Sequence, residues 1–253
     1  MKQMRKFGII VVLLVAAFLG YEVKSIDLNN GSDLLSQFIE LIPNEGTTEQ
    51  EYIDLSNIPE YDGQPYVAVN GNVPFFEDSE LTAMSFEEYS DLDALGRCGV
   101  AVASVGQDIM PTEERGSIGQ VKPTGWHTVK YDFVDGKYLY NRCHLLGYQL
   151  TGENANEENL ITGTRYLNVE GMLPLENMVA EYVEETGNHV MYRVTPIYTE
   201  DNLLADGVLM EGYSVEDQGE GITFCVYAYN VQPGVYRLSN RKQQSCGIKI
   251  SKN

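Results

Sequence analysis

The sequence predicts an α+β fold built on a central antiparallel β-sheet. Three observations support this prediction: turn signals that separate short apolar runs, a single amphipathic helix late in the chain, and three long apolar runs that follow it. Strands with few helices among them are typical of α+β folds. The apolar share of 43% among 253 residues is enough to bury a sizeable core.

The first half of the chain contains two hairpin signals. Residues 66–69 and 73–76 are apolar and flank Asn70-Gly71, a pair typical of a hairpin or tight turn. Residues 126–133 and 137–140 flank Asp135-Gly136 in the same way. Between these two signals, a buried strand is predicted at residues 100–105.

The amphipathic helix lies near residues 174–186. Pro174 suits its first turn, and Gly187 suits its C-terminal stop. Its apolar positions follow the spacing i, i+3, i+4, i+7, i+8, which predicts one buried face. These positions are Leu175, Met178, Val179, Tyr182 and Val183. Three further strands are predicted at residues 189–198, 207–213 and 222–229.

The charge balance argues at first against a nucleic-acid-binding protein. The net charge is −20 and the isoelectric point is near 4.4, so phosphates would be repelled. The acidity is uneven, however, because residues 27–93 carry 16 Asp and Glu and no Lys or Arg. Residues 97–142 hold 6 basic and 5 acidic residues, so the middle of the chain can still present a positive groove.

The N-terminus has the pattern of an export signal. Lys2, Arg5 and Lys6 precede an uncharged run over residues 7–20. Residues 1–26 are therefore predicted to be a signal peptide or a signal anchor, and either form places the bulk of the chain outside the cytoplasm. Residues 27–57 are an acidic spacer, residues 58–232 one compact domain, and residues 233–253 a polar tail.

Of three histidines, His144 is the candidate for chemistry. Asn141-Arg142-Cys143-His144 closes a predicted strand, and a polar loop follows it. A histidine beside an arginine at a strand end can act as a general base near an anionic substrate, or can simply be satisfied by backbone groups. His127 and His189 are better explained by structural or surface roles.

Downstream, Asn159, Asn168 and Glu176 are spaced so that they can share one site. If the chain is helical from near Asn168, then Glu176 lies about 2.2 turns further on a related face. An Asn carbonyl together with waters is a plausible Mg²⁺ site, although Asn168 can also cap the helix.

These residues resemble the DNA/RNA non-specific endonuclease family. Asn141-Arg142-Cys143-His144 stands where this family of ββα-metal, or His-Me finger, nucleases has Asp-Arg-Gly-His, and Asn159, Asn168 and Glu176 follow. The likeness covers about residues 58–232 and is greatest to exported bacterial members, such as DNA-entry nucleases and secreted DNases. It implies a ββα-metal motif and hydrolysis of DNA or RNA without sequence preference.

The resemblance also implies a role for each residue. His144 is the general base, Arg142 contacts phosphate, and Asn168 binds Mg²⁺, for which Mn²⁺ can substitute. Asn159 and Glu176 support the site and the metal-bound waters. A positive track for the substrate is expected from Arg115, Lys122, Lys130 and Arg165. Membrane contact is expected only through residues 7–20, which would either be removed or anchor the protein to the outer face of the cell membrane.

Two departures from the signature affect local geometry rather than the reaction class. Asn141 replaces Asp, and Cys143 replaces Gly. Cys143 also raises two other hypotheses, a Cys143–His144 hydrolase dyad and a zinc site with His127. Neighbouring strand residues face opposite sides, which disfavours the first, and the spacing of paired zinc ligands is missing for the second.

Several alternatives remain open from the sequence. The scaffold could be an exported binding module without activity. The acidic segment could guard the basic groove instead of serving as a spacer. The four cysteines, Cys98, Cys143, Cys225 and Cys246, allow three disulfide pairings.

Overall fold

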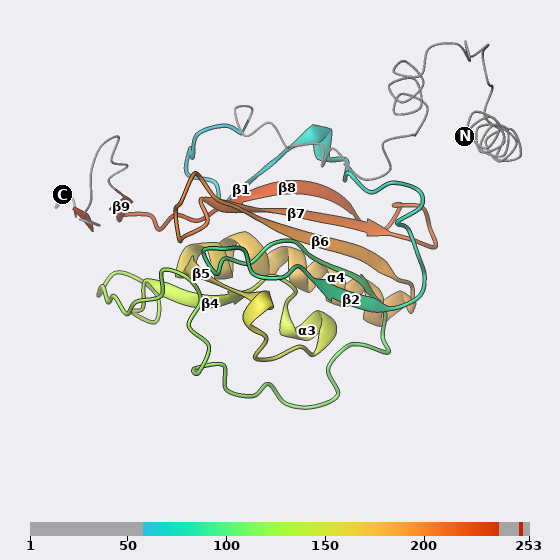
Figure 1. The fold of residues 1–253 in the computed structure, drawn as a ribbon. Coiled ribbons are helices and arrows are strands. Elements are labelled where there is room, and N and C mark those ends of the chain that lie inside the picture. The colour runs from blue at the N-terminus through green and yellow to red at the C-terminus, as the bar shows by residue number, and fades with distance from the viewer. Residues whose placement is uncertain (1–57, 238–247, 250–253) are drawn as a thin grey trace, which may run out of the picture. The chain divides into compact units, whose positions relative to one another are not determined.

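The computed structural model describes residues 58–237 and 248–249 and has the predicted α+β fold (Figure 1). The predicted signal segment, the acidic spacer, Cys246 and most of the polar tail lie outside the described residues. Among the helices that the structure describes, none is long and apolar enough to cross a membrane.

Six strands form one antiparallel sheet in the order β1-β8-β7-β6-β3-β2. They are β1 (Tyr66–Ala68), β2 (Phe86–Tyr89), β3 (Ala101–Val105), β6 (Val190–Ile197), β7 (Gly207–Ser214) and β8 (Thr223–Tyr229). A separate antiparallel pair consists of β4 (Tyr140–His144) and β5 (Leu160–Thr164). Near the C-terminus, β9 (Tyr236–Arg237) pairs with β10 (Ile248–Lys249).

The helices gather on one face of the large sheet, together with the β4–β5 pair (Figure 1). They are α3 (Tyr148–Thr151), α4 (Leu173–Thr186), the 3₁₀ turn η3 (Glu157–Asn159) and a π-helical segment η4 (Leu167–Met172). A further 3₁₀ turn, η2 (Asn70–Asn72), follows β1 and is not part of this layer. The main core lies between α4 and the sheet, where Val179 and Val183 are fully buried and meet strand residues such as Val194 and Met210.

Helix α4 has the predicted ends and nearly the predicted face. Pro174 lies in its first turn, and Gly187 stops it in a left-handed conformation with φ of 72°. Met178 is 38% exposed rather than buried. The reason is rotational: Leu175, Val179 and Val183 recur every four residues along one stripe, and Met178 lies at the flank of that stripe.

The opposite face of the sheet is covered by residues 74–80. The guanidinium of Arg193 lies 4.5 Å from the Phe76 ring centroid and pairs with Glu211, which is 1% exposed. Glu211 also accepts a hydrogen bond from the backbone of Phe75 at 2.7 Å. Of the hairpin or tight turn expected at Asn70-Gly71, the structure has the tight turn, η2, which takes the chain out of the sheet and across its face, so residues 73–76 form no strand.

Two other predicted elements differ in extent. Around Asp135-Gly136 the chain does turn, and Lys137 N–H donates to Val134 O at 2.8 Å. The flanking runs 126–133 and 137–140 pair only through a single bridge between Lys130 and Tyr138, and regular pairing starts at β4. Strands β2 and β5 had no clear alternating pattern in the sequence, and were not predicted.

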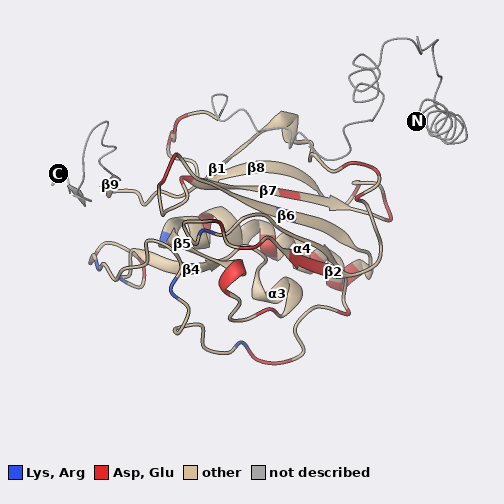
Figure 2. Ribbon diagram, viewed as in Figure 1, with Lys and Arg blue, Asp and Glu red and all other residues tan. Residues whose placement is uncertain are grey.

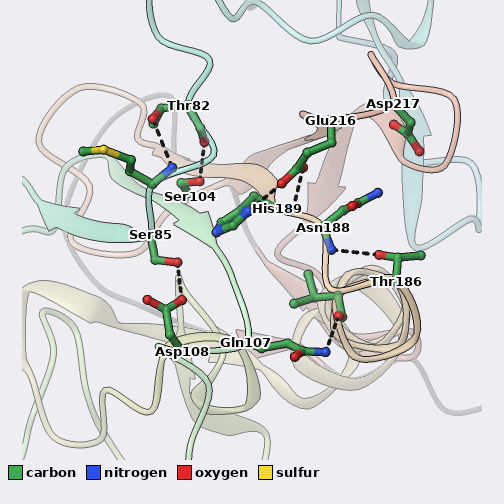
Figure 3. A network of polar contacts seen from close by, with 12 residues as sticks. Thr82, Ser85, Ser104, Gln107, Asp108, Thr186, Asn188, His189, Glu216 and Asp217 are labelled. Carbon is green, nitrogen blue, oxygen red and sulfur yellow. Dashed lines mark hydrogen bonds and ion pairs between the residues drawn. The ribbon is translucent and has the colours of Figure 1, made fainter.

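A polar network ties the loops together at one end of the sheet (Figure 3). His189 Nδ1 lies 2.7 Å from a Glu216 carboxylate oxygen, which links the start of β6 to the β7–β8 loop. Ser85 donates a hydrogen bond to Asp108, and the Gln107 amide donates to the Val183 carbonyl at 3.1 Å near the end of α4. The contacts of His189 therefore hold two loops together, which is a structural role.

Candidate active site

A cavity of about 710 Å³ lies beside β4 and the start of α4. Its wall includes four residues predicted for catalysis or metal binding, namely Arg142, His144, Asn168 and Glu176. It also includes Asn141, Arg115 and Arg165. Residues up to 61 positions apart in the sequence, Arg115 and Glu176, therefore meet at one cavity, and its size is typical of a ligand site.

His144 ends β4 and is oriented through both ring nitrogens. Nε2 lies 2.7 Å from the backbone oxygen of Asn154, and Nδ1 lies 3.2 Å from Nη2 of Arg115. Since a carbonyl only accepts and a guanidinium only donates, Nε2 carries the proton and Nδ1 holds the lone pair. The ring is thus fixed in one neutral tautomer, with its basic nitrogen toward Arg115.

The environment of His144 keeps its ring uncharged. Burial lowers the pKa of His144 to about 4, and the Arg115 charge adds to this, against the opposing hydrogen bond to Asn154. The side chain is only 6% exposed. At neutral pH the imidazole is therefore unprotonated, the form in which it can accept a proton.

Arg115 contacts His144 directly, which the sequence did not indicate. It was predicted only as part of a positive track, yet its guanidinium touches the imidazole. It lies in a loop 29 residues upstream of His144 with no periodic pattern. No spacing rule could have found this contact, because the path of the loop alone decides it.

Asn168 lies inside the π-helical segment η4, one residue after its start. It does not cap a helix: the N-cap positions of η4 and α4 are Tyr166 and Met172. Among the residues that the structure describes, none forms a hydrogen bond with the Asn168 side chain, which lines the cavity. The capping alternative is therefore not supported, and the amide oxygen is open to a ligand.

Glu176 lines the same cavity from the first turn of α4. Burial raises its pKa to about 8, and the charge of Arg115 lowers it only in part. Gly147 makes room for this carboxyl, because a Cβ there would lie 2.8 Å from a Glu176 oxygen. Within the described residues, the carboxyl has no hydrogen-bond or ion-pair partner.

Asn159 supports the site from behind and does not face the cavity. Its fully buried amide oxygen accepts hydrogen bonds from the backbone of Leu145 at 3.1 Å and Leu146 at 2.8 Å, and its NH₂ donates to Leu146 O. These bonds fix the chain just after His144, so the position of the imidazole depends on Asn159.

The arginine of the motif is held by backbone groups. Arg142 donates to Gly119 O at 2.9 Å and to Val121 O, and its guanidinium lies 3.9 Å from the Trp126 ring centroid. It therefore anchors the 119–126 loop while still lining the cavity. Asn141 accepts a bond of 3.4 Å from Arg165.

The predicted positive track is only partly assembled. Arg115 and Arg165 line the cavity, and Arg165 also pairs with Asp135 at 2.8 Å. Lys122 and Lys130 do not line it; Lys130 instead places its Nζ 4.4 Å from the centroid of Tyr138, which does. Basic residues gather around the β4–β5 end of the fold, while acidic residues are more widespread (Figure 2).

The cysteine alternatives do not fit the structure. The Cys143 thiol is fully buried in the core, away from the cavity wall, and burial raises its pKa. Cys98, Cys143 and Cys225 are all free thiols. In the part of the chain that the structure describes, no group of three or more His, Cys, Asp or Glu is placed to hold a metal. A Cys143–His144 dyad and a zinc site with His127 are therefore wrong.

Residues 76–216, more than half of the chain, match the family model described as DNA/RNA non-specific endonuclease. The chain belongs to the DNA/RNA non-specific endonuclease family. The matched stretch contains every residue named for the site, from Arg115 to Glu176. The family resemblance inferred from the sequence is thus confirmed. Among curated proteins, no match to this chain was found.

Solved nuclease structures share the fold of this family member. NucA from Streptococcus agalactiae with magnesium bound aligns with a TM-score of 0.64 at 22% identity, over 77% of this chain and 91% of NucA. The metal-free form of NucA aligns with a TM-score of 0.63 at 22% identity, over 78% of this chain and 92% of NucA. Sda1 nuclease with bound zinc aligns with a TM-score of 0.57 at 21% identity, over 70% of this chain and 94% of Sda1. The fold is therefore that of the ββα-metal nucleases.

Proposed function

We propose that this endonuclease-family protein hydrolyses phosphodiester bonds in DNA and RNA without sequence preference, with His144 as general base and one Mg²⁺ as cofactor. The observation that carries the proposal is the orientation of His144. Its proton-bearing Nε2 is bonded to Asn154 O at 2.7 Å, and the lone pair on Nδ1 points to the charged side of the cavity.

His144 removes a proton from a water in this proposal. The water attacks phosphorus in line with the departing 3′-oxygen, which leaves as a hydroxyl after taking a proton from solvent. Arg115 turns from Nδ1 to the phosphate, which frees the Nδ1 lone pair to accept the proton of the attacking water while Nε2–H remains bonded to Asn154. The ring must be neutral beforehand, which its low pKa supports. The product is expected to carry a 5′-phosphate.

Arg115 stabilises the charge that develops on the phosphate. Its guanidinium already faces His144 at 3.2 Å, so both groups reach the same reacting centre. A preorganised cation in a partly closed cavity stabilises developing negative charge better than one in water. Arg142, bonded to two backbone oxygens, contributes mainly by its fixed position and its charge.

The donor atoms at the cavity wall fit a hard divalent cation. Asn168 supplies an amide oxygen and Glu176 a carboxyl, and both lack partners among the described residues. Mg²⁺ prefers oxygen ligands and keeps several waters, so it needs few protein groups, and Mn²⁺ can replace it. The cation would act as a Lewis acid toward the phosphate and the leaving oxygen. The magnesium in the NucA structure supports this assignment.

A plasmid-nicking assay tests the proposal. The full-length chain is expected to convert supercoiled DNA to nicked circles with Mg²⁺, and to stop when EDTA is added. An RNA substrate should also be cleaved. Cleavage that continues unchanged in EDTA would contradict metal dependence. Binding without any cleavage would favour the alternative, an exported nucleic-acid-binding module that has lost activity.

We further propose that the domain over residues 58–232 acts outside the cell. The basic and apolar N-terminal segment over residues 2–20 supports export, either as a cleaved peptide or as a membrane anchor. Residues 27–57 would then be an acidic spacer. Deleting them should leave activity unchanged at every salt concentration. A guard that covers the basic groove predicts instead higher activity at low salt only, because salt screens such contacts.

A further inference from the structure

Aromatic side chains occupy a large share of the cavity wall. Trp126, Tyr138, Tyr140 and Tyr148 all line it, and three of these come from residues 126–140, the segment that leads into β4 and includes its first residue. Cleavage chemistry at a phosphate does not itself require aromatic rings. Their presence beside His144 therefore indicates a second recognition task at this site.

Tyr138 is the aromatic residue most open to a ligand. It is 48% exposed although it lines the cavity. The other three rings are only partly exposed, and each has a partner: Trp126 stacks on Arg142 at 3.9 Å, Tyr140 meets the His127 ring at 4.8 Å, and the Tyr148 hydroxyl donates to Glu113 O at 2.8 Å.

A positive charge lies over one face of the Tyr138 ring, so a base would stack on the other face. Lys130 Nζ is 4.4 Å from the ring centroid, and Arg165 lines the same cavity. The backbone holds this arrangement, because Tyr131 N–H donates to Lys137 O at 2.9 Å and Leu139 N–H donates to Val129 O at 3.0 Å. A flat apolar face next to a cation matches a nucleobase and its phosphate, and such pairs recur in proteins that bind single strands.

Resting on the proposed nuclease function, we propose that Tyr138, with Lys130 over one face of its ring, forms a subsite for an unpaired nucleobase on the other face, next to the phosphate that is cleaved. In a duplex both faces of each base are stacked, so a base must be extruded before it can stack on a protein ring, at a cost of a few kcal/mol. The enzyme therefore favours single-stranded DNA or RNA over duplexes.

Tyr138→Ala tests the subsite in the full-length chain. For a single-stranded oligonucleotide, KM is expected to rise about tenfold with kcat within threefold, because base–aromatic stacking is of that order. For a hairpin duplex, kcat/KM should change less than threefold. Tyr138→Phe keeps the ring and should behave as the wild type. Phe133→Ala is the matched control, since Phe133 is 53% exposed in the same segment but does not line the cavity.

A substrate that lacks one base adds a direct probe. Removing the base beside the cleaved phosphate should lower kcat/KM of the wild type and leave Tyr138→Ala unaffected, because the variant has no ring on which that base could stack. Equal KM values for the wild type and Tyr138→Ala on single strands would overturn the subsite. Equal losses on single strands and duplexes would overturn it as well.

The design separates this inference from the proposed function. If the wild type cleaves nothing, the nuclease proposal fails, and fluorescence anisotropy of the labelled single strand in EDTA still tests Tyr138. Weaker binding by Tyr138→Ala than by Phe133→Ala would support the subsite in that case, and equal binding would overturn it.

Discussion

His144 and Arg115 face each other across 3.2 Å, with the lone pair of the imidazole toward the guanidinium. A neutral base and a permanent cation therefore share one point of the cavity wall. The cation helps to keep the base unprotonated, because a second positive charge beside it is unfavourable. The same cation lies where negative charge would develop on a phosphate. In the proposed reaction, His144 would therefore accept the proton and Arg115 would stabilise the negative charge.

Replacing His144 by Ala is expected to lower kcat by about 10²–10⁴-fold, the usual contribution of a positioned base. Added imidazole should restore part of the rate, since the substitution leaves space in the cavity wall. His127→Ala is the control, because His127 lies outside the cavity wall and contacts Gly125 O. A His144→Ala rate within threefold of the wild type would show that His144 is structural.

The acid limb of the pH–rate profile should lie unusually low. Because burial lowers the pKa of His144 to about 4, kcat/KM should fall only as the pH drops toward that value. A solvent-exposed imidazole would lose activity below about 6.5. Since kcat/KM reports the free enzyme, the measurement should use substrate well below KM. An acid limb near 6.5 would contradict the buried environment.

Asn168→Ala should abolish most activity without loss of stability. The side chain caps no helix, so the free energy of unfolding should change by less than the roughly 1 kcal/mol expected for a lost cap. Excess Mg²⁺ should recover part of the activity, because the variant weakens metal binding. A variant that is destabilised yet fully active would restore the capping interpretation.

Metal-free protein should lose stability as the pH rises from about 5 to 9. Burial raises the pKa of Glu176 to about 8, so the folded state keeps a proton that the unfolded state has already released. Unfolding then releases a proton and becomes more favourable at higher pH. Glu176→Gln removes this titration and should flatten the pH dependence of Tm measured in EDTA. Equal slopes for both proteins would contradict the assignment.

Arg193→Met should destabilise the fold by about 3–5 kcal/mol, because it leaves Glu211 buried without its partner. Adding Glu211→Met should recover much of that loss, since the buried charge is then gone. Lys137→Met is the control: its pair with Asp132 is largely exposed and worth about 0–1 kcal/mol. Urea unfolding of all four proteins, including the wild type, measures these differences.

The sequence by itself determined the family and most of the secondary structure. Helix α4 and strands β6 to β8 follow from patterns that each segment carries locally, namely a stripe every four residues and long apolar runs. Asn141 to His144 lie within one short segment, so the motif could be recognised without knowing the fold.

Only the tertiary structure decided what these residues touch. Arg115 reaches His144 from a loop, Asn159 bonds the chain after β4 from behind, and residues 73–76 leave the sheet to cover a buried ion pair. Each of these contacts joins segments that are far apart in the sequence, and the path of the chain between them is set by packing. Local sequence patterns do not predict that path, because secondary-structure propensity and hydrophobic periodicity depend on a few neighbouring residues only.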